Sequence, residues 1–86
     1  MAETLNFDLV ASAWTEVASG SSDVLVQRRG VHPVLVHVGE TAPALDAPSA
    51  IIWDGEPTFA AGGLGAADKV FARGETNVST VTVVRS

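Results

Sequence analysis

VLVQRRGVHPVLVHVG, residues 24–39, contains two short Val-rich runs, each closed by a glycine. Valine occupies alternate positions in both runs, which is the period-two pattern of a strand with one buried face. Similar runs recur about every eight to twelve residues and end at Gly, Pro, Asn or Asp, without long helical stretches between them. This spacing is typical of an all-β sandwich or barrel.

We expect about eight short strands, the number in a jelly roll or a related sandwich. The prediction is therefore an all-β, compact antiparallel β-sandwich of jelly-roll type, formed as a single domain by residues 1–86. The sequence also predicts the local structure of two connections between strands. Residues 62–68 could form one helical turn, and residues 54–57 a tight turn in which Gly55 is free to adopt a positive φ. The strands are expected around residues 5–9, 14–18, 24–28, 33–38, 51–53, 58–60, 69–73 and 78–84.

The alternation also selects a core, with Leu64 expected to close one end of it. The predicted core residues are Leu5, Phe7, Val17, Val24, Val26, Val34, Val36, Val38, Ile52, Phe59, Val70, Val81 and Val83.

Composition favours a chain that associates with other subunits. A domain of 86 residues has a thin core, and this one has no cysteine for a disulfide. Apolar residues make up 47% of the chain and charged residues only 17%, which is little charge for so much surface. The net charge of −5 argues against nucleic-acid binding. No run is long enough to span a membrane, and we expect no secretory signal.

Residues that could perform chemistry are sparse, and we predict no enzyme, no cofactor and no metal site. His32 and His37 are five residues apart, so a straight strand would point them to opposite faces. The glycines of residues 62–65 lack the third glycine of a dinucleotide site. Asp54 and Glu56 flank Gly55, where solvated carboxylates are expected. No paired acid and base, or nucleophile with a base, is evident.

The remaining candidates are contacts with a partner. Trp14 and Trp53 carry large apolar areas suited to core or interface packing, and an aromatic ring on a β surface could instead stack on a sugar. The adjacent arginines of the first run fall at a turn and are expected to donate ion pairs to a neighbouring subunit. The middle loop is rich in proline and small residues. The candidate interface residues are Trp14, Arg28, Arg29, Pro43, Pro48 and Trp53.

The strand runs also carry a resemblance to a known group of proteins. WTEVASG, VLVQRRG, PVLVHVG, ADKVFARG and a closing VTVV span most of the chain, from Trp14 to Val84. In this order, around a loop rich in Ala and Pro, they resemble small virion structural proteins of tailed bacteriophages and of phage-like gene transfer agents. That group includes capsid decoration proteins, bases of head spikes or fibres, and small tail or baseplate adaptors.

The resemblance implies a non-enzymatic virion structural protein, made in the host cytoplasm and located on the particle surface. It would oligomerise there and decorate or stabilise the capsid, or anchor a head spike or fibre. The implied partners are further copies of itself, as trimers or pentamers, and the major capsid protein or a fibre. A carbohydrate-binding or host-surface adhesion module, with a glycan as partner, is the alternative, as is a tail or baseplate adaptor.

Overall fold

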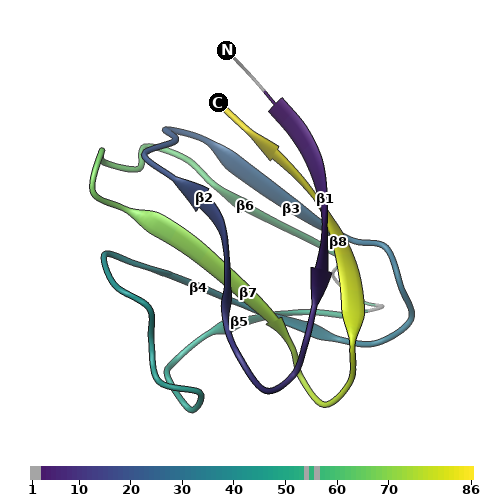
Figure 1. Cartoon of the computed structure of the whole chain (residues 1–86). Helices are drawn as coiled ribbons and strands as arrows, with labels where there is room; N and C mark the ends of the chain where they lie inside the picture. Colours follow the sequence, from purple (N-terminus) through teal and green to yellow (C-terminus); the bar gives the residue numbers. More distant parts are fainter. Residues whose placement is uncertain (1–2, 54, 56) are drawn as a thin grey trace.

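Two four-stranded antiparallel sheets pack face to face in the computed structural model, which describes residues 3–53, 55 and 57–86 (Figure 1). No helix forms among these residues. The strands are β1 (Glu3–Leu9), β2 (Thr15–Ser19), β3 (Val24–Arg28), β4 (Val34–Gly39), β5 (Ala50–Ile52), β6 (Thr58–Ala61), β7 (Lys69–Gly74) and β8 (Ser79–Arg85).

The strand order is that of a jelly roll. One sheet has the order β1-β8-β3-β6 and the other β2-β7-β4-β5. Strand β1 pairs with β8, β2 with β7, β3 with β6 and β4 with β5, all antiparallel. The chain therefore forms one long hairpin of four strand pairs, rolled so that its pairs alternate between two sheets. This confirms the sandwich of eight strands that the sequence predicts.

The core lies between the sheets and consists mainly of the alternating valines. Nine of the thirteen predicted core residues are buried, and Phe7, Phe59 and Leu64 are partly buried against them. Leu9, Ala18, Phe71 and Ala72 are buried too, although the sequence did not single them out.

A β-bulge in β2 explains the burial of Ala18. Glu16 pairs with Phe71 and Ala18 with Val70, so the register shifts around Val17. A bulge puts two residues of one strand opposite one residue of its partner. Val17 and Ala18 are both buried as a result, where strict alternation would have turned one of them outward.

Two core predictions are corrected at the margins of the sheets. Val38 continues the alternation of Val34 and Val36 and is therefore predicted to be buried. The prediction is wrong, because Val38 is 36% exposed. Strand β5 pairs with β4 only as far as Val36, so it does not cover the flank of Val38. Leu5 is only half-buried, because β1 is an edge strand with one open side.

The two turn predictions have different outcomes. The predicted tight turn of residues 54–57 includes Asp54 and Glu56, which lie outside the described residues, so a positive φ at Gly55 stays a prediction. A Cβ atom at Gly55 would lie 2.7 Å from Cη2 of Trp53, so a side chain there would require the indole to move. Residues 62–68 form a turn and no helix: the Asp68 amide donates to the Gly65 carbonyl, and the Gly65 amide donates to Asp68 Oδ2.

Candidate interaction surface

The loop of residues 40–49 is held against the outer face of the β2-β7-β4-β5 sheet by side chains from three strands or their ends. We call Trp14, His37, Phe71 and Arg73 the loop clamp. The loop connects β4 to β5 and carries no strand of its own. Its path is instead determined by hydrogen bonds from the clamp to three of its carbonyl groups.

Trp14 and Arg73 bind the middle of the loop. The indole Nε1 of Trp14 donates to the Ala44 carbonyl over 2.9 Å. Arg73 Nη2 donates to the Leu45 carbonyl over 2.8 Å, and Nη1 donates to the carbonyl of Ala11 over 3.1 Å. The guanidinium carbon lies 5.2 Å from the centroid of the Trp14 ring, a cation–π arrangement that fixes both groups.

His37 and Phe71 complete the clamp. They are direct cross-strand neighbours on β4 and β7, with ring centroids 6.5 Å apart, and the Trp14 ring lies 6.0 Å from His37. Nδ1 of His37 is 2.7 Å from the Pro48 carbonyl, so the imidazole donates to the end of the loop. Phe71 is only 4% exposed although it points away from the core, since this second, smaller cluster covers it.

A patch of apolar side chains adjoins the clamp. Leu35 and Ile51 are direct cross-strand neighbours, and Trp53 follows two residues after Ile51 on the same face. Ile51 is 42% exposed and Trp53 49% exposed. Leu45, 48% exposed, belongs to the loop that Arg73 binds, and Arg73 is the other cross-strand neighbour of Leu35. We call Leu35, Ile51 and Trp53 the β5 patch.

The structure brings together four of the six candidate interface residues. Trp14, Pro43, Pro48 and Trp53 all belong to the clamp, its loop or the β5 patch, but the Trp14 indole is occupied by contacts within the chain. The two arginines lie apart from them. Arg28 is half-buried at the end of β3 and donates to the Val31 carbonyl, and Arg29 is exposed with its amide bound to the Thr80 carbonyl.

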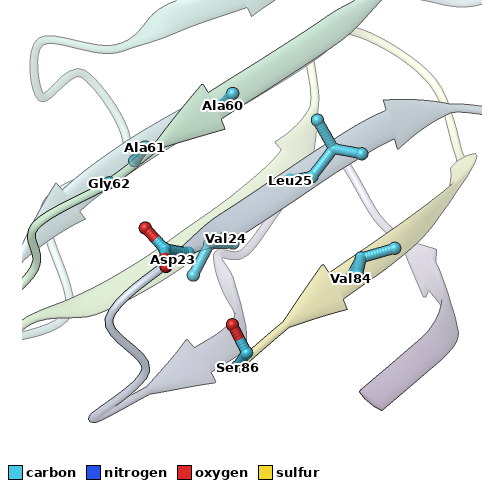
Figure 2. Close-up of a pocket in the computed structure, with 8 residues that line it drawn as sticks. All are labelled: Asp23, Val24, Leu25, Ala60, Ala61, Gly62, Val84 and Ser86. Carbon is cyan, nitrogen blue, oxygen red and sulfur yellow. The ribbon is translucent and has the colours of Figure 1, made fainter. Parts of the chain in front are cut away.

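The outer face of the other sheet is more polar. Thr82 donates to Asn6 over 2.7 Å and Thr80 to Asp8 over 3.2 Å across the β1–β8 pair. One end of this face carries a hollow of about 340 Å³, whose floor crosses three strands through Ala60, Leu25 and Val84 (Figure 2). The hollow is largely apolar and open.

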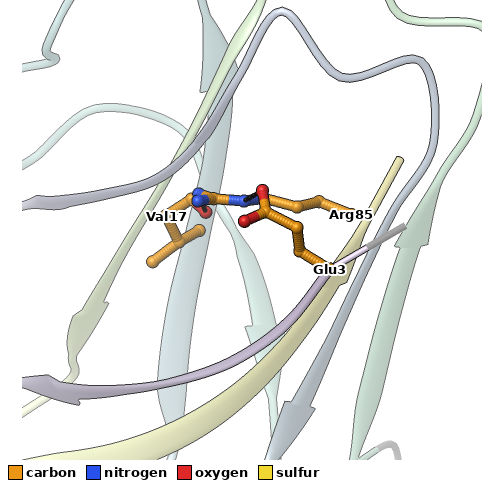
Figure 3. Close-up of polar contacts among 3 residues, drawn as sticks. All are labelled: Glu3, Val17 and Arg85. Atoms are coloured by element: carbon orange, nitrogen blue, oxygen red, sulfur yellow. Dashed lines mark hydrogen bonds and ion pairs between the residues drawn. The ribbon is translucent and has the colours of Figure 1, made fainter. Parts of the chain in front are cut away.

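Arg85 ties the two sheets together near this end (Figure 3). From β8 in one sheet, its Nη1 donates over 2.7 Å to the Val17 carbonyl in the other, at the bulge of β2. Its Nε also lies 3.3 Å from a carboxylate oxygen of Glu3. A bulge leaves its extra residue out of the strand ladder. The arginine therefore supplies a hydrogen bond where the ladder is interrupted.

The sequence did not identify Arg73, Arg85 or Phe71 as important residues. One signal was present for Phe71. In the strand Lys69-Val70-Phe71-Ala72-Arg73, three consecutive residues are apolar, so apolar side chains point to both faces, as in a strand that is covered on both sides. The arginines carry no such signal, because their partners are carbonyl groups that only the fold brings near.

Side chains that could hold a metal ion do not cluster in the described part of the chain. Among residues 3–53, 55 and 57–86, no three metal-ligating side chains come together. Asp54 and Glu56, the carboxylates on either side of Gly55, lie outside the described residues. No helix in the same part of the chain is long and apolar enough to cross a membrane.

Comparisons of the chain with protein-family models, with curated proteins and with solved structures found no match.

Proposed function

We propose that this chain is a non-enzymatic virion structural protein that oligomerises on the surface of a particle. In this role it decorates or stabilises the capsid, or anchors a head spike or fibre. Its partners are further copies of itself, in trimers or pentamers, and other virion proteins such as a major capsid protein. Two observations support this proposal. The strand runs resemble those of virion structural proteins, and the jelly roll is a fold that occurs repeatedly in viral capsid domains.

The observation that carries the proposal is the β5 patch. Its members are not scattered: Leu35 and Ile51 are paired across two strands, and Trp53 extends the same face. Large exposed apolar groups that adjoin one another mark interaction sites in proteins of this size. Tryptophan is among the residues that most often dominate the binding energy of an interface.

The loop clamp supports the same proposal through rigidity. A partner that binds a flexible loop must order it at a cost in conformational entropy. Here the three carbonyl groups of Ala44, Leu45 and Pro48 are already bound from the sheet. The loop and the β5 patch therefore form a surface that is ordered before a partner arrives.

Two experiments test the proposal, one on the assembly of the chain and one on its location. Replacing Ile51 with Thr and Trp53 with Ser should shift a discrete oligomer towards monomer in native mass spectrometry. The matched control Gln27→Ser, on the opposite outer face, should leave the oligomer unchanged.

Gold-labelled antibody against the chain should mark the surface of virus particles purified from the source cells. Unlabelled particles would contradict a virion role, and an oligomer insensitive to the double change would remove the β5 patch from it.

One observation favours the adhesion alternative, namely that Trp53 exposes half of its surface beside Ile51. A sugar ring stacked on this indole would shift its fluorescence. The variant Trp14→Phe leaves Trp53 as the only tryptophan. A saturable shift on titration with glycans, retained in Trp14→Phe and lost in Trp53→Phe, would favour adhesion. A flat response would leave assembly as the better account.

A further inference from the structure

Strand β1 differs from the other three edge strands in length and regularity. The sheets end at β1, β6, β2 and β5. Strand β5 has three residues and β6 has four, while β2 is interrupted by its bulge. Short and bulged edges are the usual protection of a sheet against pairing with another chain. Strand β1 has seven residues, all in unbroken register with β8, and lacks these protections.

The core is incompletely covered on the same flank. Leu5 and Phe7 point inward, since they pair with the buried Val83 and Val81, yet both are only half-buried. In Figure 1, β1 lies at the flank of the sandwich beside β8. A strand added to its open side would cover these two side chains as well as the backbone groups of the edge.

We propose that β1 pairs antiparallel with β1 of a second copy, so that two β1-β8-β3-β6 sheets join into one continuous sheet. A two-fold contact uses the same surface on both partners. The register centred on Asn6 overlaps the whole of β1. It sets Leu5 opposite Phe7 and keeps the inward residues of both copies on one side of the joined sheet, because directly opposed residues share a face.

The alternation of the strand supports this register. A shift by one residue would set the inward Leu5 opposite the outward Asn6, so the inward residues of the two copies would no longer share one side. The centred register places Glu3 opposite Leu9 and Asp8 opposite Thr4, so each carboxylate of the strand meets an uncharged residue. In it the Thr4 hydroxyl of one copy extends the hydrogen bond that Thr80 makes to Asp8 in the other.

The contact deepens the proposed function without depending on it, since it concerns only two copies of the chain. It uses the flank opposite the β5 edge, so both surfaces can be occupied at once. A trimer or pentamer joined through the β5 patch would become a dihedral hexamer or decamer through β1. An edge of seven residues is small for a protein interface, so we expect a weak dimer on its own.

Cysteine crosslinking tests the register directly, because the chain has no cysteine of its own. In Asn6→Cys the two introduced thiols would lie on the two-fold axis, within the Cα separation of about 4.4–6.8 Å that a disulfide spans. Held together in this way, they should oxidise about tenfold faster or more than thiols that meet by collision. Thr4→Cys, Asp8→Cys and Gln27→Cys are the controls, all on the same outer face and all exposed.

The outcomes separate clearly. Fast dimerisation of Asn6→Cys alone, and a mixed dimer of Thr4→Cys with Asp8→Cys, would support the pairing. Equal rates for all four single variants, or the fastest rate at Gln27→Cys, would overturn it. A native oligomer without the Asn6→Cys crosslink overturns the β1 contact but leaves assembly intact. A fast Asn6→Cys crosslink with unlabelled virus particles keeps the β1 contact and removes the virion role.

Discussion

Leu9 and Leu45 are both leucines, but one is buried and the other is exposed. Leu9 is fully buried at the end of β1, while Leu45 is 48% exposed in the loop over the other sheet. Leu9→Ala should lower the free energy of unfolding by about 2–5 kcal/mol, through lost burial and the cavity left behind. Leu45→Ala should change it by about 0.5 kcal/mol or less. Urea unfolding of both variants measures the difference, and equal losses would contradict the assigned core.

Arg85 gives a second prediction at the level of single residues. Arg85→Met keeps much of the side-chain stem but leaves the Val17 carbonyl at the bulge without its donor. We expect a loss of about 1–3 kcal/mol in the free energy of unfolding, the cost of an unsatisfied buried acceptor.

Glu3, which forms an ion pair with Arg85, provides the control for the Arg85 variant. Glu3 has a side chain 58% exposed, and ion pairs on the surface contribute little. Glu3→Gln should therefore cost about 0.5 kcal/mol or less. A larger loss in Glu3→Gln than in Arg85→Met would show that the ion pair, and not the tie between the sheets, is what Arg85 provides.

At the scale of elements, the loop of residues 40–49 depends on the clamp. Trp14→Phe removes the donor to Ala44 and keeps an aromatic ring, so the loop should open more often. The amide of Ala47, which donates to the Ala44 carbonyl, should exchange with deuterium about tenfold faster, as expected for the loss of one hydrogen bond. Trp53→Phe, outside the clamp, should leave this exchange rate unchanged. Equal acceleration in both variants would contradict the clamp.

The strands themselves were predictable because their signal is local. Alternating valines in residues 24–28 and 34–38, with glycine after each, indicate half-buried strands without knowledge of their partners. The same local rule failed where a neighbouring element decides burial. Val38 continues the alternation but lies beyond the end of β5, and Ala18 breaks the alternation because β2 bulges beside it.

The candidate interaction surface was predictable only in its parts. Trp14, Trp53, Pro43 and Pro48 stand out by residue type, and the structure places them near one outer face. That Trp14 binds the loop while Trp53 stays exposed follows from the partner strands, which no spacing in the sequence specifies. Arg73 was missed for the same reason, since it binds backbone carbonyl groups from residues as distant in sequence as Ala11 and Leu45.

At the scale of the whole molecule, the two surfaces that we propose for contact with other subunits are distinct. The β5 patch offers apolar side chains, and the β1 edge offers backbone hydrogen bonds with half-buried Leu5 and Phe7 behind it. The two surfaces lie on different sheets, β5 at the edge of one and β1 at the edge of the other. Their use together would let a small domain with a thin core gain stability from assembly.

Native mass spectrometry of the purified chain over a concentration series is the decisive test of self-assembly. Self-assembly predicts a discrete oligomer that grows at the expense of the monomer as the concentration rises to tens of micromolar. Its copy number would identify the symmetry, with an even number expected where the β1 contact is filled. A clean monomer across the whole series would contradict self-assembly as the function of this jelly roll.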